Sequence, residues 1–408
     1  MAHKDGEKVK GRRPIGLALA GGGLGGAVYE IGALRALDEV LEGVDLNDLD
    51  IYVGVSAGAF IGACLVNDLK TDQMCRAILK NEPGEHPFVP GTFLTPAVGE
   101  LFQRTLAIPG LLRDAVFEYL QSPGEHTIRE SLTRLARALP VGVFDNEPIR
   151  QYLHKIYTIK GRTDDFRELG RKLVVVAADL DSGEPVLFGT EGFDDVPISR
   201  AVQASSALPG IYPPVEIGGR YYVDGVLLKT LHASVALEAG AELLLCINPI
   251  VPVDTVRAVE KGIMKRGKLI DRGLVTVLSQ TMRTLIRSRL DAGMARYEDR
   301  FKGSDIMLLE PKRDDYNMFF RNIFSFRGRH DVCEHAYRNT RAELLARHDE
   351  LAPLLERHGI TLRRDLLEDQ DRRLWDHIGL PKTTSKSSPA VIRDLDTLLS
   401  RLEETVGA

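Results

Sequence analysis

The chain has 408 residues, of which 44% are hydrophobic and 27% are charged, and its formal net charge is −5. This balance is that of a globular protein with a large core, and it gives no reason to expect nucleic acid as a partner. The four cysteines are scattered without metal-ligand spacing, so we predict no disulfide framework, no metal and no cofactor, and we expect a reducing cytoplasmic location.

The first elements in the chain alternate between strand and helix. Residues 1–13 are basic without an apolar stretch behind them, which predicts a mobile tail and no secretory signal. Residues 14–20 and 51–55 are apolar runs typical of buried strands, and residues 27–41 between them read as a helix. This alternation predicts a parallel sheet covered by helices. No run of about 18 apolar residues predicts a membrane span.

A glycine-rich segment, Gly21–Gly26, follows the first strand and matches G-x-G-x-x-G, the dinucleotide-binding fingerprint. A dinucleotide fold needs an acidic residue at the end of the second strand, about 20 residues further on. The chain instead has Ser56 there, between Gly54 and Gly58, which is the G-x-S-x-G pattern of a nucleophile elbow. We therefore interpret the glycine-rich segment as a set of backbone donors for a transient oxyanion. The alternative is that these glycines only allow a helix to pack closely on a strand.

The segment 81–140 interrupts the alternation with several prolines and predicts an insertion over one end of the sheet. Its apolar residues favour equally a lid around an acyl-chain channel and ordinary core: Phe88, Phe93, Leu94, Leu101, Phe102, Leu106, Ile108, Leu111, Leu112, Val116 and Phe117.

The next elements are more strands with two short helices. We predict strands at 172–180, 185–188, 215–225 (two strands around a Gly-Gly turn) and 243–247, and helices within 197–210 and 231–239. Asp224 ends an apolar strand before Gly225, either as a general base for Ser56 or as an ordinary Asp-Gly turn. His232 is interpreted as a surface or capping residue, and His330 and His335 as solvated.

Four segments, 20–34, 53–60, 204–219 and 221–226, together resemble the patatin-like phospholipase family. The resemblance implies a three-layer α/β/α sandwich with a mostly parallel sheet, here followed by a helical C-terminal extension. It also implies a serine–aspartate dyad that acts on lipid acyl esters. By position, Ser56 is the nucleophile and Asp224 the base, an oxyanion hole is formed by Gly21, Gly22, Gly23 and Leu24, and the motifs are completed by Gly26, Gly54, Gly58 and Gly225.

The chain departs from the family pattern at two places. Gly25 stands where the family usually has a cation, and Val226 follows Asp224-Gly225 where Gly or Ala is usual. The resemblance covers a catalytic domain (14–249), which contains the insertion or lid 81–140. The patterns of the other segments predict a mobile basic tail (1–13), a mostly helical extension (250–380), and a linker with a terminal helix (381–408).

The expected function is a lipid acyl hydrolase of phospholipase A or lysophospholipase type, a serine carboxylic-ester hydrolase working through an acyl-enzyme, with acyl transfer where an alcohol replaces water. One alternative is a non-catalytic lipid- or nucleotide-binding protein on the same scaffold. Another, an α/β-hydrolase with a histidine triad, is disfavoured because only one strand precedes Ser56. The substrate would be a phospholipid or another acyl lipid.

Residues 255–302 contain 12 Lys and Arg against 5 Asp and Glu. Leucines and arginines alternate there in a pattern that fits a basic amphipathic helix lying on an anionic membrane surface, at the inner face of the membrane. The pattern fits somewhat better a helix packed on the domain or a homodimer contact. The residues concerned are Leu269, Leu274, Leu278, Leu285 and Ile286 with Arg272, Arg283, Arg287 and Arg289.

Overall fold

Eight strands form the central sheet of the computed structural model, which describes residues 13–79, 91, 94–97, 140–262, 269–319, 326–376 and 378. The strand order is β6-β7-β4-β3-β1-β8-β9, and β5 also pairs with β4. The strands are β1 (Ile15–Leu19), β3 (Ile51–Val55), β4 (Lys172–Asp179), β5 (Pro185–Phe188), β6 (Val215–Ile217), β7 (Arg220–Asp224), β8 (Leu243–Ile247) and β9 (Asp305–Leu309).

Five of these strands, β4, β3, β1, β8 and β9, run parallel to one another. Their residues are almost all buried, because helices cover both faces of a parallel sheet. The remaining pairs, β4 with β5, β4 with β7 and β6 with β7, are antiparallel. The mostly parallel sheet confirms the fold class predicted from the alternation of apolar runs.

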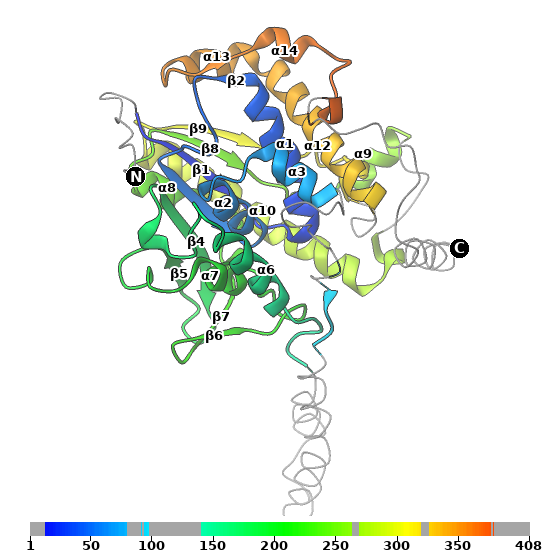
Figure 1. Ribbon diagram of the computed structural model, residues 1–408. Coiled ribbons are helices and arrows are strands. Elements are labelled where there is room, and N and C mark those ends of the chain that lie inside the picture. The colour runs from blue at the N-terminus through cyan, green and yellow to red at the C-terminus, as the bar shows by residue number, and fades with distance from the viewer. Residues whose placement is uncertain are drawn as a thin grey trace, which may run out of the picture.

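Helices cover both faces of the sheet and make it the middle of three layers (Figure 1). Ile15, Leu17 and Leu19 pack with one set of helices, whereas Ala18 and Ala20 pack with the other, as the two-residue period of a strand requires. The first set is α1 (Gly23–Val40), α2 (Ala57–Val66), α3 (Thr71–Leu79), α6 (Glu147–Tyr157), α7 (Ile198–Ser205), α12 (Phe326–Ala346) and α13 (His348–Glu356). The second set is α8 (Ala233–Glu238) and α10 (Leu274–Arg300).

The segment after residue 250 is part of this sandwich. It is mostly helical, as expected, but it also supplies β9, which extends the sheet beyond β8 and was not predicted. Its helix α12 lies along α1 (Figure 1), so closely that a Cβ atom on Gly32 would be 2.4 Å from the carbonyl oxygen of Cys333. The smaller elements are β2 (Leu41–Glu42), which pairs with β10 (Thr361–Leu362), α9 (Thr255–Glu260), α11 (Tyr316–Phe319), α14 (Arg364–Glu368) and the 3₁₀ turns η2 (Phe166–Glu168), η3 (Gly225–Leu227), η4 (Leu269–Arg272) and η5 (Leu374–Asp376).

One element boundary differs clearly from the predictions. Helix α1 begins at Gly23, four residues earlier than expected, because the glycine-rich segment itself forms the first helical turn. Helix α7 lies within the predicted range 197–210 and ends at Ser205, before Pro209 and Gly210. The expected tail before residue 13, nearly all of the insertion 81–140 and the terminal segment 381–408 lie outside the described residues; of the apolar residues expected to form the lid, only Leu94 is described. Among the described helices, none is both long and apolar enough to cross a membrane.

Candidate active site

Ser56 occupies a sharp turn between β3 and α2. Its backbone angles are φ 53° and ψ −117°, a region that non-glycine residues rarely adopt and that is typical of strained functional positions. The flanking glycines are required by close packing. A Cβ atom on Gly58 would be 2.4 Å from the backbone of Leu19, and one on Gly54 would be 2.4 Å from the Cα atom of Ala59. The geometry is that of the nucleophile elbow expected from G-x-S-x-G.

A second serine, Ser205 at the end of α7, supports this turn. Its hydroxyl accepts a hydrogen bond from the N–H of Ser56 at 2.8 Å and donates one to the carbonyl of Val176 at 2.6 Å. Ser205 is fully buried, so both bonds are shielded from water. No role was predicted for Ser205, and its place in the segment 204–219 was the only signal for it.

Asp224 lies at the carboxyl end of β7, where it is 2% exposed. Its carboxylate accepts a hydrogen bond from the N–H of Val226 at 2.9 Å. Burial raises the pKa of Asp224 to about 7, while hydrogen bonding by the Val226 amide and the Ser56 side chain opposes that rise. A carboxyl group with this pKa is a far stronger base at neutral pH than an exposed aspartate.

The register of the sheet brings Ser56 and Asp224 together. Strand β3 pairs with β4 in parallel as far as Val55, which lies opposite Val176. Strand β7 pairs with β4 in the antiparallel direction and ends with Asp224 opposite Ala177. Strand β5 pairs with residues 175–178 of β4, which overlap the residues paired with β3 and those paired with β7. Strand β5 therefore occupies the opposite edge of β4 from both, so β3 and β7 lie end to end on one edge. The residue that follows β3 and the last residue of β7 therefore meet.

The N-terminus of α1 provides backbone donors beside Ser56. The first hydrogen bond within this helix runs from the N–H of Gly26 to the carbonyl of Gly22 at 3.0 Å. The N–H groups of Gly23, Leu24 and Gly25 precede that bond, so the helix gives them no acceptor, and its dipole favours an anion there. These residues line one pocket with Ser56.

Gly21 differs from the expected oxyanion donors. Its N–H donates to the carbonyl of Thr230 at 3.3 Å, so this amide is already engaged. Gly21 is needed instead for close approach, since a Cβ atom there would lie 3.0 Å from the side chain of Val226 and 3.4 Å from that of Ser56. The side chain of Val226, the residue that departs from the family pattern, thus packs over Gly21, while the N–H of Val226 donates a hydrogen bond to Asp224. Gly225 is equally constrained, because a Cβ atom there would lie 2.5 Å from the carbonyl oxygen of Val176.

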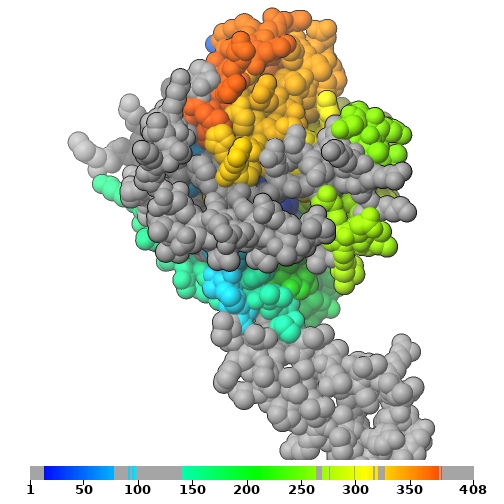
Figure 2. Space-filling model, turned by 90° about the vertical axis from the view of Figure 1, so that its right-hand side faces the viewer, coloured from blue at the N-terminus to red at the C-terminus, as the bar shows by residue number. Residues whose placement is uncertain are grey.

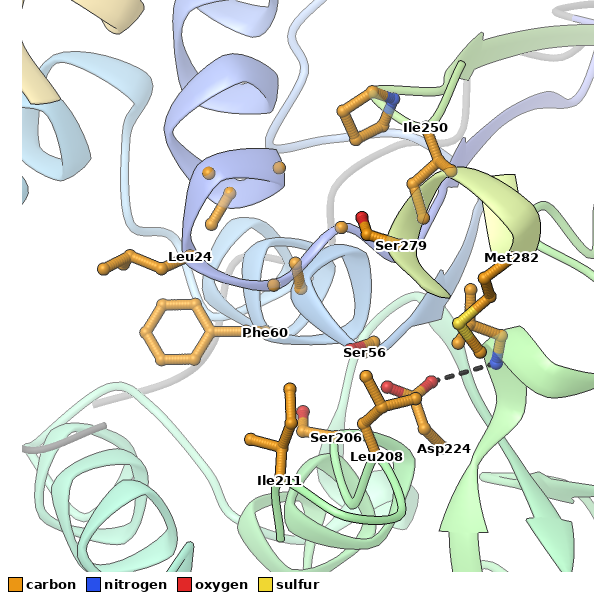
Figure 3. Close-up of a pocket in the computed structure, with 18 of the residues that line it drawn as sticks. Leu24, Ser56, Phe60, Ser206, Leu208, Ile211, Asp224, Ile250, Ser279 and Met282 are labelled. Carbon is orange, nitrogen blue, oxygen red and sulfur yellow. Dashed lines mark hydrogen bonds between the residues drawn. The ribbon is translucent and has the colours of Figure 1, made fainter. Parts of the chain in front are cut away.

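Ser56 and Asp224 open into a mainly apolar pocket of about 470 Å³ (Figure 3). The view shows the start of α1, the loop after α7 and the helix α10 around it, with Leu24, Ile211 and Met282 on different sides. The other large apolar side chains that line the pocket include Phe60, Leu94, Phe144, Ile149, Leu208, Ile250, Ile286, Met318 and Phe319. Such a cavity is suited to an acyl chain.

The histidines differ from expectation in their surroundings. His232 is buried and not at the surface, and burial lowers its pKa to about 4. His335 is half-buried with Nε2 2.6 Å from Asp315, and His330 stacks on Trp375 at 4.1 Å between ring centroids, so neither is simply solvated. No histidine within the described ranges lines the pocket.

The basic face expected along 255–302 is largely engaged within the protein. Arg287 pairs with Glu310 at 2.5 Å and with Asp291 at 2.8 Å. Arg289 donates to the carbonyl of Leu227 at 2.8 Å, and Arg283 lines the pocket. Three leucines of this segment, Leu274, Leu278 and Leu285, face solvent.

The structure is thus a three-layer α/β/α sandwich. Its site combines an elbow serine, a buried aspartate and the glycine-rich N-terminus of a helix, and this combination defines one structural class of α/β proteins. The family model for patatin-like phospholipases matches residues 17–237, which is more than half of the chain. The chain therefore belongs to the patatin-like phospholipase family.

Individual relatives are distant. The probable lipid hydrolase 463L of Invertebrate iridescent virus 6 is 21% identical over 224 residues, 54% of this chain and 63% of that protein. The uncharacterized protein R571 of Acanthamoeba polyphaga mimivirus is 22% identical over 228 residues, 55% of this chain and 62% of that protein. The chain thus spans less than two thirds of the length of these curated relatives.

Two solved structures show weaker likeness. VipD from Legionella pneumophila has a TM-score of 0.36 and 14% identity, covering 81% of this chain and 66% of that one. The type III effector protein ExoU has a TM-score of 0.29 and 13% identity, covering 85% of this chain and 60% of that one.

Proposed function

We propose that this chain is a lipid acyl hydrolase of the phospholipase A or lysophospholipase type, with Ser56 as nucleophile and Asp224 as general base. The observation that carries the proposal is the meeting of a strained elbow serine and a buried aspartate in an apolar pocket. The family assignment supports it, as does the name of the viral relative, a probable lipid hydrolase.

In the first half of the reaction, Asp224 takes the proton of the Ser56 hydroxyl as its oxygen attacks the ester carbonyl of the lipid. The carbonyl oxygen becomes an oxyanion, and the N–H groups of Gly23, Leu24 and Gly25 stabilise it at the N-terminus of α1. The tetrahedral intermediate then expels the alcohol, which receives the proton from Asp224. Ser56 is left as an acyl ester.

In the second half, Asp224 takes a proton from water as the water oxygen attacks the acyl ester, and when the second tetrahedral intermediate collapses Asp224 returns that proton to the Ser56 oxygen, which releases the fatty acid and restores Ser56. An alcohol that reaches the same position in place of water would receive the acyl group. The chain then acts as an acyltransferase by the same sequence of bond changes. Which acceptor predominates depends on how much water enters the apolar pocket.

We also propose contact with a lipid surface through five side chains, Ile270, Leu274, Val277, Leu278 and Leu285, which we call the α10 apolar patch. All five are exposed, and Leu274 is 71% accessible. Positions 274, 278 and 285 fall on one side of α10, next to the side that lines the pocket. The yellow-green residues of this segment lie at the surface in Figure 2. Burial of such a patch in a bilayer is favourable, and it would bring the pocket to its substrate.

Covalent labelling tests the proposed nucleophile. A fluorophosphonate reacts only with an activated serine, so the intact mass of the wild-type protein is expected to rise by one adduct. Ser56→Ala is expected to remain unlabelled, whereas Ser206→Ala, which removes another serine hydroxyl from the same pocket, is expected to label fully. Mass spectrometry of a mixed lipid extract would then identify the fatty acids released by the wild type and not by Ser56→Ala. Labelling of Ser56→Ala would overturn the assignment.

A further inference from the structure

Arg283 brings a positive charge to the wall of the pocket that contains Ser56 and Asp224. Its Nη1 donates to the carbonyl of Val251 at 3.2 Å, and its Nε approaches the hydroxyl of Ser279 at 3.4 Å. The guanidinium carbon lies 5.2 Å from the ring centroid of Phe319. All three of these partners are electrically neutral.

Arg283 has no acidic partner among the residues that the structure describes, in contrast with Arg287 one turn later on α10. Arg287 pairs with Glu310 and Asp291, and these carboxylates raise the pKa of its guanidinium. The pKa of Arg283 is lowered, and burial is the cause. A poorly solvated charge without a counter-ion is costly, so the site favours an anion supplied from outside.

The guanidinium retains the means to bind such an anion. Of its five N–H donors, two have acceptors among the described residues. The planar fork of an arginine matches the oxygens of a phosphate group and forms strong charge-assisted hydrogen bonds with it. Among the described residues that line the pocket, Arg283 is the one cation. The rest of the wall is mainly apolar and fits an acyl chain.

We propose that Arg283 binds the phosphate of a glycerophospholipid whose acyl ester lies at Ser56, and so selects phospholipids over neutral acylglycerols. The inference rests on the proposed function, because the phosphate of such a lipid lies a few bonds from its ester. Arg283 thereby acts on substrate binding, and its loss is expected to raise KM more than it lowers kcat.

The test compares two lipids that differ in the phosphate group. Dihexanoyl phosphatidylcholine and dihexanoylglycerol, dispersed in the same detergent micelles, are assayed with wild type, Arg283→Met, Arg283→Lys and the control Arg296→Met, which alters an exposed arginine of the same helix. In Arg283→Met the phosphatidylcholine-to-diacylglycerol ratio of kcat/KM is expected to fall about 10- to 100-fold, as for loss of a charge-assisted hydrogen bond. Arg283→Lys is expected to keep part of the preference, and Arg296→Met all of it.

Calorimetric binding separates this inference from the proposed function. In the Ser56→Ala background, which cannot turn over substrate, monomeric dihexanoyl phosphatidylcholine is expected to bind about 10-fold or more weakly when Arg283 is also Met. The melting temperature of Arg283→Met is expected not to fall, since an uncompensated charge is removed. Arg283-dependent binding without hydrolysis by the wild type would overturn the proposed function alone. Hydrolysis with an unchanged ratio, or with binding unaffected by Arg283→Met, would overturn the role of Arg283 alone.

Discussion

The N–H of Val226 donates to the buried carboxylate of Asp224 at 2.9 Å, and this bond offsets only part of the effect of burial. An aspartate in that position holds its proton to about pH 7 and releases it above. The same environment therefore controls both the reactivity of Ser56 and the pH dependence of the folded state.

The first prediction concerns the pH profile. Because Asp224 must be ionised to accept the serine proton, kcat/KM on p-nitrophenyl butyrate should rise about tenfold per pH unit below pH 7 and level off above it. Asp224→Asn should lose about 10³-fold or more, since the amide cannot accept the proton. A wild-type profile that is flat between pH 5 and 8 would show that another group is the base.

The second prediction concerns stability. The pKa of Asp224 is about 7 when folded and near 3.8 when unfolded, so unfolding releases a proton between these values and the wild type loses stability as pH rises from about 4 to 7. The asparagine of Asp224→Asn does not ionise, so this variant does not lose stability as the pH rises. It should be more stable than the wild type at pH 8 by up to about 4 kcal/mol, with little difference at pH 4. Urea unfolding at both pH values measures this, and an equal difference at both would contradict it.

The third prediction concerns Ser205. Ser205→Ala leaves the N–H of Ser56 and the carbonyl of Val176 without their shared partner, which should cost about 1–3 kcal/mol of unfolding free energy. The backbone angles of Ser56 at the elbow should also be less firmly fixed, so kcat should fall about 10-fold or more with KM nearly unchanged. Ser206→Ala, at the next position, removes no bond to Ser56 and serves as the control. A change in KM without a change in kcat would exclude a positioning role.

The fourth prediction compares two glycines of α2. Gly58→Ala should prevent folding or abolish labelling of Ser56, because the new Cβ atom would meet the Leu19 backbone at 2.4 Å. Gly62→Ala places its Cβ atom 3.9 Å from the side chains of Leu19 and Leu173, so it should be tolerated and raise helix stability by up to about 1 kcal/mol. Thermal unfolding and fluorophosphonate labelling distinguish them. A folded and active Gly58→Ala protein would refute the steric requirement.

The fifth prediction tests the α10 apolar patch. The double variant Leu278→Glu and Leu285→Glu should sediment with phosphatidylglycerol vesicles far less than the wild type, while turnover of soluble p-nitrophenyl butyrate stays within about twofold. Both side chains are exposed and neither lines the pocket. If the patch instead joins two copies of the chain, light scattering should show the mass of the variant halved and vesicle binding unchanged.

The parts of the fold that sequence predicted best depend on local constraints. Strands β1, β3 and β4 are continuous apolar runs buried on both faces, and few other secondary structures give short runs of that kind. Ser56 was identifiable because Gly54 and Gly58 flank it within one short strand–turn–helix pattern of the sequence; Gly54 packs on Ala59 of the same unit, and Gly58 packs on Leu19 of the neighbouring strand β1. Whether Ser56 and Asp224 act as nucleophile and base stays a prediction.

What sequence could not provide depends on contacts between distant segments. The bond between Ser205 and Ser56 joins positions 149 residues apart and has no local signature. The charge pattern of α10 left open an exposed basic face or a helix packed on the domain, and only the structure shows that Arg283 lines the pocket and that Arg287 pairs with Glu310. His232 was interpreted as a surface or capping residue because its helix looked amphipathic; it occupies the N-cap position of α8, but it is buried and its side chain makes no capping hydrogen bond.

The contact between Gly32 and Cys333 limits how this protein can be dissected for engineering. The family boundary lies near residue 237, yet α12 packs directly on the helix whose first turn faces Ser56. A fragment excised at that boundary would lose β8 and β9 and uncover one side of α1, leaving an open sheet edge prone to aggregation. Chimeras that exchange substrate preference between relatives should therefore take α1 and α12 from the same parent protein.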